Sequence, residues 1–319
     1  MKVLTPIDPT DAMLVAANIT EDDYAEWSAA TNYVIGDYVI STATHTVYRA
    51  LVASGPATTA VDPDLEAANF TDPLVDTSAE TRHWQIIGAT NLWKLFDKKP
   101  SVQAINADTI DVSLTPGDIV GGIGLFNVNA SSVRVTVTSA AEGLVYDQTR
   151  ELVDNENVTD WYDFFFAAIE ELDEITFLEL PPYADATYRI VVTREAGTAY
   201  VGQIVLGSVK DLGTTLIGGT GFDGFDFSTI STDVFGNIQT TRRAATRVNR
   251  FRVLAQMTRM QAIERILNDL RGGVPAVWIG ATDDRVNALA YGYARDWRVD
   301  YLDPEANAAN LTLEIQGIV

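Results

Sequence analysis

The sequence predicts a mainly β protein with some helix, of the α+β class. It should contain a small three-stranded β-module, an antiparallel β-sandwich, and a C-terminal β-sheet with one packed amphipathic helix. Three observations carry this prediction. Apolar residues alternate in short runs from residue 107 onward, as in half-buried strands. Glycine- and proline-containing turns separate these runs. One segment near the C-terminus changes to helical spacing.

The pattern changes at four places, and the 319 residues are enough for two or three domains. Pro6 and Pro9 break the start of the chain, so we expect an irregular arm there. Residues rich in Gly, Asp, Ser and Thr should form a long connection with a hairpin at Gly236 and Asn237. The expected segments are an N-terminal arm (1–23), a small β-module (24–90), a β-sandwich (91–206), the connection (207–241) and a strand–helix–strand module (242–319).

The C-terminal module has the most consistent local signals. Arg250 and Arg252 alternate with Phe251 and Val253, which indicates a strand. Helical spacing then predicts a helix from an N-cap at Thr258 to about Arg271. Glycines 272 and 273 and Pro275 should end it. The sequence predicts three further strands, at residues 276–279, 289–302 and 311–319.

We expect this module to carry assembly, because its last strand is apolar to the end of the sequence and needs a sheet to pair with. The candidate assembly residues are Ile263, Ile266, Leu267, Leu270, Trp297, Leu313 and Ile315.

The formal charge of −22 excludes a nucleic-acid-binding protein of the ordinary basic kind. The charge is uneven. Residues 242–319 contain 11 arginines and 9 acidic residues, which leaves 11 basic and 35 acidic residues in the first 241. This difference would arise if the acidic part and the near-neutral C-terminal part faced different surroundings. An acidic surface suited to a saline habitat would also explain it. The sequence also lacks an apolar signal segment or membrane span. We therefore expect a protein made in the cytosol that does not insert in a bilayer.

The residues needed for most catalytic and metal sites are missing. There is no cysteine, and the two histidines, His45 and His83, both lie in the small module. Asp223, Asp226 and Asp233 have a spacing that fits no EF-hand. We expect no catalytic activity, no metal and no cofactor, although counting carboxylates alone leaves a two-carboxylate glycosidase open.

The small module has a distinctive aromatic and glycine pattern. EWSAATNYVIGDYV is followed by VYRA and, after a loop rich in Pro and Asp, by RHWQII. This pattern resembles the chitin-binding-type module of many chitinases, which implies three short strands with a hairpin turn at Gly36 and Asp37. The resemblance implies sugar stacking, with Tyr33 and Trp84 as the better platforms and Trp27 and Tyr48 as further candidates. The alternative is that these aromatic residues form the core of a very small domain.

Short motifs along most of the chain resemble a family of tailed-bacteriophage tail-tip or minor tail proteins. They are WKLFD (93–97), DWYDFFF (160–166), PPY (181–183), DLG (211–213), DVFG (233–236) and WIG (278–280). The aromatic motif at 160–166 should be core or a subunit contact. The C-terminal module also looks like the ring-forming unit of distal-tail and tail-tube proteins.

That resemblance implies a structural virion protein of the tail tip or baseplate, made in the host cytoplasm. It implies a homo-oligomeric ring, with a hexamer favoured and a trimer as the alternative, that contacts tail-tube, hub or fibre proteins. The alternative function is a tail protein that binds cell-surface glycan during host attachment.

Overall fold

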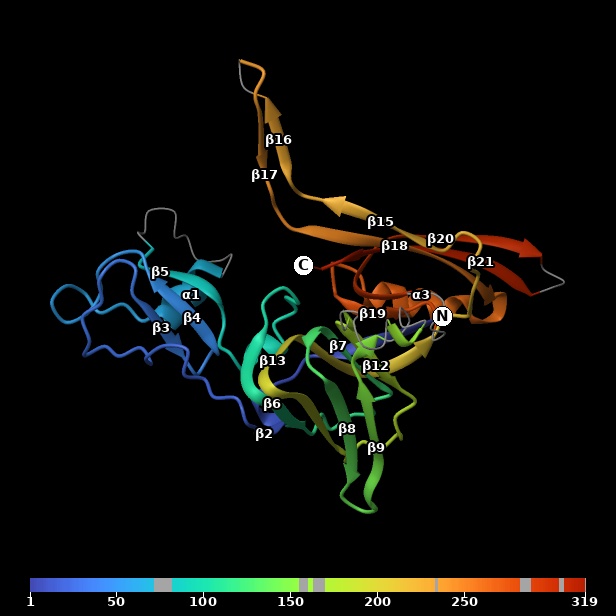
Figure 1. Ribbon diagram of the computed structural model, residues 1–319, viewed down its shortest axis with the longest axis horizontal. Coiled ribbons are helices and arrows are strands. Elements are labelled where there is room, and N and C mark those ends of the chain that lie inside the picture. Colours follow the sequence, from blue (N-terminus) through green and yellow to red (C-terminus); the bar gives the residue numbers. More distant parts are fainter. Residues whose placement is uncertain are drawn as a thin grey trace.

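The structure is a computed structural model that describes residues 1–71, 82–154, 160–162, 170–232, 235–281, 288–303 and 307–318. Strands make up 54% and helices 10%, so the predicted mainly β class is confirmed. Figure 1 shows a small module beside a larger body, from which a narrow β-ribbon projects.

The strand β13 (Thr187–Asp211) organises the body. Its first half lies between β6 (Ala104–Leu114) and β8 (Ser132–Ser139). Its second half pairs with β7 (Gly122–Asn129) and with the N-terminal strand. An irregularity in the pairing between residues 193 and 198 interrupts the alternation of this strand without ending it.

The remaining strands of this half extend the two layers that β13 joins. In one layer β2 (Leu14–Ala17) pairs with β6, and β9 (Gly143–Glu151) pairs with β8. In the other, β12 (Glu174–Leu178) pairs with β7. Two short strands, β10 (Val153–Asp154) and β11 (Glu170–Glu171), pair antiparallel with each other. A large core of alternating apolar residues from both layers lies between them, as the sandwich prediction requires.

The N-terminal segment is not an arm. β1 (Lys2–Ile7) pairs on one side with β13 and on the other with β19 (Ala276–Ile279), so it joins the two halves of the body into one sheet. Pro6 is accommodated because pairing with β19 ends at Leu4, which leaves an open edge where the proline lies. Gly207 of β13 is required at this joint, since a Cβ there would overlap the carbonyl oxygen of Thr5.

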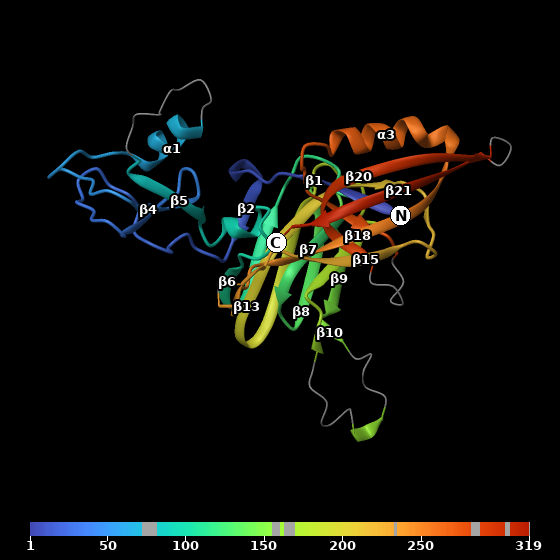
Figure 2. The same ribbon diagram turned by 90° about the horizontal axis from the view of Figure 1, so that it is seen from above.

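The C-terminal module follows the predicted order. β18 (Ala245–Gln256) and β20 (Leu289–Asp303) both pair with β21 (Ala308–Gly317). The helix α3 (Met260–Asp269) covers one face of these strands (Figure 2) and shares their core. A 3-10 turn, η3 (Met257–Arg259), precedes it, so Thr258 is not the N-cap. Gly272 and Gly273 have positive φ at its end, as predicted.

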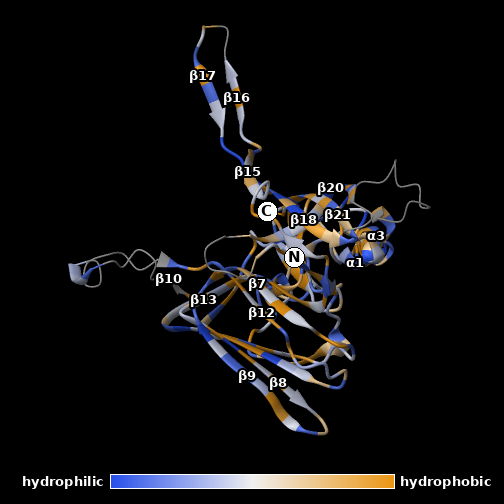
Figure 3. Cartoon of the chain, turned by 90° about the vertical axis from the view of Figure 1, so that its right-hand side faces the viewer, coloured by the Kyte–Doolittle hydropathy of each residue, from blue (hydrophilic) through white to orange (hydrophobic). Residues whose placement is uncertain are grey.

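Between β13 and β18 the chain forms a long ribbon. β14 (Thr214–Thr215) and β15 (Gly221–Asp226) pair with β18. β16 (Thr229–Thr232) and β17 (Ile238–Thr241) then pair only with each other and stand clear of the body (Figure 3). The expected hairpin at Gly236 and Asn237 is confirmed, and Gly236 has φ +85° in its turn.

The described residues of the small module form a three-stranded sheet and one short helix. The strands are β3 (Tyr38–Ser41), β4 (Thr46–Ala50) and β5 (Trp84–Ala89), and the helix is α1 (Pro63–Thr71). Gly36 and Asp37 do form a turn, with Gly36 at φ +98°. That turn leads into β3, however, and the β3–β4 hairpin turns at residues 42–45.

Candidate functional site

The aromatic residues predicted to stack on sugar are mostly core. Tyr33 is 7% exposed, and Tyr48 and Trp84 are each 2% exposed. The ring of Trp84 packs edge-on against Tyr33, and its Nε1 donates to the carbonyl of Val61 at 2.8 Å. Trp27 is half-buried against the same cluster. Tyr33 and Trp84 are therefore not stacking platforms, because a domain this small needs these rings for its core.

A buried carboxylate fixes β5 in the small module. The backbone N–H groups of His83 and Trp84 donate to the two carboxylate oxygens of Glu66 at 2.8 and 2.7 Å. Glu66 lies on α1 and is 8% exposed. These amides stabilise its charge, so Glu66 holds β5 against α1.

The other histidine connects the small module to the N-terminal segment. The ring nitrogens of His45 lie 3.0 Å from Glu21 and 3.1 Å from Asp11, and the ring stacks on Trp93. Burial alone would lower the pKa of His45, but its hydrogen bonds to Glu21 and Asp11 outweigh this effect and raise the pKa. The contact holds two parts of the chain together.

The predicted assembly residues lie inside the C-terminal module. Ile263, Leu267 and Leu270 are buried, as are Leu313 and Ile315, while Ile266 and Trp297 are partly buried against the same core. The prediction that these helix residues form one buried apolar stripe is confirmed. Their burial within one chain shows that these side chains stabilise the module itself, and it leaves little of them for contact with another subunit.

The aromatic motif at 160–166 is described only in part. Trp161 is 79% and Tyr162 69% exposed, so these two residues are not core. Residues 163–166 lie outside the described part of the chain, as does Asp233. Among the described residues no group of His, Asp and Glu could hold a metal ion, and no helix is long and apolar enough to span a membrane.

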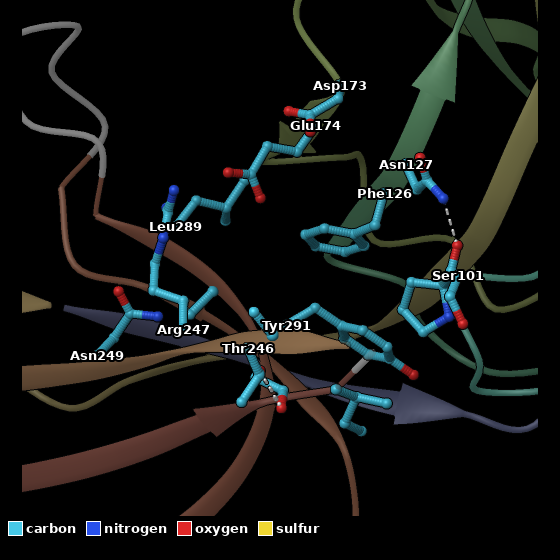
Figure 4. A pocket seen from close by; sticks show the side chains of 15 residues that line it. Ser101, Phe126, Asn127, Asp173, Glu174, Thr246, Arg247, Asn249, Leu289 and Tyr291 are labelled. Carbon is cyan, nitrogen blue, oxygen red and sulfur yellow. Dashed lines mark hydrogen bonds between the residues drawn. The ribbon is translucent and has the colours of Figure 1, made fainter. Parts of the chain in front are cut away.

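A cleft of about 390 Å³ lies where the sandwich meets the C-terminal module (Figure 4). β12 and the segment before it contribute Glu174 and Asp173, and β18 contributes Arg247 and Asn249. No motif in the sequence marks this site, because its residues come from distant segments. One signal was present: Asn249 interrupts the apolar side of an otherwise regular strand.

Aromatic rings form the floor of the cleft. Phe126 of β7 and Tyr291 of β20 stack with centroids 5.0 Å apart and planes inclined by 21°. Burial raises the pKa of Tyr291, which keeps its hydroxyl neutral. Both rings belong to the small apolar cluster that joins the two halves, together with Leu4 of β1 and Val277 of β19. The joint therefore gives the cleft a fixed floor.

The polar groups of the cleft have opposite hydrogen-bonding roles. Figure 4 shows the side chains of Glu174 and Arg247 extending toward each other from opposite walls. Within the described residues, neither carboxylate of Asp173 and Glu174 forms a salt bridge. Burial, followed by the charge of Asp173, raises the pKa of Glu174 to about 7, although Arg247 opposes the rise. The cleft thus holds a partly buried carboxylate whose charge is poorly compensated.

We expect Glu174→Gln to stabilise the protein selectively at alkaline pH. The pKa of Glu174 rises from its ordinary value of 4.5 to about 7 in the folded chain. The folded state then binds the proton more tightly, so the stability that Glu174 contributes is greatest below pH 4.5 and is lost as pH rises through 7. Glutamine has no charge to bury. After allowance for partial exposure, the variant should gain about 1–2 kcal/mol over the parent at pH 8.5 relative to pH 5.

Urea unfolding at the two pH values measures this difference. Glu264→Gln, on the exposed side of α3, is the matched control and should show no such gain. An equal effect of Glu174→Gln at both pH values would contradict the burial of this charge.

Comparison with known proteins gives little further information. No family model matches the chain, and no curated protein matches it. Among solved structures, a mutant of chitosan-binding module 1 from a chitosanase/glucanase of Paenibacillus sp. IK-5 matches 36% of this chain and 83% of its own. The identity is 12% and the TM-score 0.24, which is too low to support an argument about fold or function.

Proposed function

We propose that this chain is a structural subunit of a phage tail tip or baseplate that associates into a homo-oligomeric ring. The resemblance of the sequence to tail-tip proteins supports a place in the phage tail. A feature of the fold supports contact with a second copy or another protein. That feature is the hairpin of β16 and β17. It is two-stranded over its whole length and has no further layer packed on it among the described residues.

One face of this hairpin exposes two isoleucines. Ile230 pairs with Thr240, and Thr232 pairs with Ile238, so these four side chains share a face, which we call the ribbon face. Ile230 and Ile238 are each 72% exposed. Residues 227–241 contain a single charged residue, Asp233. An isolated two-stranded hairpin is only marginally stable in water, and exposed apolar surface of this kind marks a contact site.

The proposal places the assembly contact on the ribbon face instead of on the helix stripe. Because the stripe residues of α3 are buried within the module, a neighbouring subunit cannot reach them without unfolding it. The ribbon face requires no such change. The glycan-binding alternative loses its sequence basis in the small module, since Tyr33, Tyr48 and Trp84 are buried there.

The test is the mass of the purified chain by light scattering, together with negative-stain images. We expect closed rings from the parent chain. A double variant, Ile230→Lys with Ile238→Lys, should give a smaller species, because two lysines on this face would have to be buried without partners. The matched control places lysines on the opposite face, at Ser231 and Gln239, and should keep the parent mass. A parent that stays monomeric, or a ribbon-face variant with the parent's mass, contradicts the proposal.

A further inference from the structure

The cleft between the sandwich and the C-terminal module is lined by acidic, basic and amide side chains. Its polar groups do not satisfy one another. No hydrogen bond of the Glu174, Arg247 or Asn249 side chains occurs among the described residues, although the guanidinium of Arg247 lies 4.9 Å from the ring centroid of Phe222. Two other polar side chains of the lining are paired. Thr246 Oγ1 donates to the carbonyl of Gly317 at 2.7 Å, and Asn127 Nδ2 donates to that of Pro100 at 2.6 Å.

Asn249 is the least expected of these groups. The residue is 4% exposed and lines the cleft. Asn249 stands where the strand alternation would suit an apolar side chain, and its amide is not shut off from solvent but opens into the cleft. A ligand that enters the cleft can supply the missing hydrogen bonds.

The combination of groups defines the chemistry of that ligand. The carboxylate of Glu174 accepts hydrogen bonds, the guanidinium of Arg247 only donates them, and the amide of Asn249 does both. A hydroxyl group both donates and accepts, so neighbouring hydroxyls can bond to opposite walls at once. Phe126 and Tyr291 close the bottom of the cleft but are only 4% and 8% exposed, so they offer no ring face for stacking. Polar walls of both roles above this closed floor suit a molecule that carries hydroxyl groups around its edge.

We infer that this cleft binds a neutral saccharide, with Glu174 and Arg247 on opposite sides of one sugar unit. Asp173 and Glu174 would attract a cationic ligand, but Arg247 would repel it. Arg247 would attract an anionic ligand, but the two carboxylates would repel it. An uncharged polyol satisfies both walls. The volume of about 390 Å³ falls in the range of small-molecule sites, and it accommodates one or two sugar rings. This inference does not depend on the ring assembly, because every wall of the cleft belongs to one chain.

The test uses the full chain and four neutral trisaccharides: tri-N-acetylchitotriose, cellotriose, maltotriose and mannotriose. Binding is measured by calorimetry with the parent and with Arg247→Ala and Glu174→Ala. The control is Arg250→Ala, which changes an exposed arginine on the same strand whose guanidinium pairs with Asp223 and Glu314 outside the cleft. Chitotriose, which is cationic, and glycylglycine, which is a zwitterion, test the other chemistries.

We expect at least one neutral trisaccharide to bind the parent. Its affinity should fall at least tenfold in both cleft variants, since each removes a hydrogen bond to a charged group, and should be unchanged in Arg250→Ala. Thermal unfolding of each variant without ligand shows that it remains folded. The inference is overturned if none of the four neutral sugars binds, if only chitotriose or glycylglycine binds, or if the cleft variants bind like the parent. Because mass and binding are measured separately, loss of one does not imply loss of the other.

Discussion

Leu4→Asp is expected to lower the stability of the protein by more than about 4 kcal/mol, because it places an unpaired charge in a dry joint. Leu4 is fully buried in the small cluster that includes Phe126 of β7 and Val277 of β19. Its strand, β1, is the only link between β13 and β19 in the described sheet order. The carboxylate would disrupt both pairings at once.

The experiment compares urea unfolding of the parent, Leu4→Asp and Val15→Asp. Val15 lies on β2 and is 61% exposed, so an aspartate there should cost less than about 1 kcal/mol. The buried indole of Trp278 on β19 contributes a fluorescence signal from the C-terminal side of the joint. If Leu4→Asp cannot be purified folded, Leu4→Ala gives a smaller measure of the same site, expected at about 2–5 kcal/mol. A cost for Leu4→Ala below about 0.5 kcal/mol would show that β1 is not a joint.

The contrast between β1 and α3 shows what the sequence could predict. The helix stripe and the glycines that end it lie within 14 residues of one another, so local periodicity identified them. β1 pairs with residues about 200 positions later in the chain and is only six residues long. Pro6 makes a strand unexpected there. The local sequence does not show that Pro6 lies beyond the pairing with β19, where a proline is tolerated.

The candidate sites differ in the same way. The aromatic pattern of the small module correctly predicted a Trp and Tyr cluster on a three-stranded sheet. A sequence motif cannot distinguish a ring that fills a core from a ring that faces solvent, because Trp and Tyr are favoured in both places. Here Tyr33 and Trp84 lie in the core. The cleft has no motif. Glu174 and Arg247 are neighbours only because β1 and β13 bring the two halves together.

Leu267→Ala is expected to cost about 2–5 kcal/mol, as large-to-small changes in packed cores do. Leu267 lies in the middle of α3, is 1% exposed, and belongs to the core that the helix shares with β18 and β21. Gln261→Ala, on the exposed side of the same helix, is the control for helix propensity and should change stability by less than about 0.5 kcal/mol.

This substitution also separates the two roles that the sequence suggested for the stripe. If Leu267 contacted a neighbouring subunit, its truncation would change the mass of the assembly while leaving the folded chain as stable as the parent. Its burial within one chain predicts the reverse: reduced stability in urea, with the mass unchanged under conditions where the variant remains folded. Measuring both quantities on the same preparation decides between them. If Leu267→Ala changed the mass of the assembly but was as stable as the parent, the assembly contact would lie on α3 and not on the ribbon face.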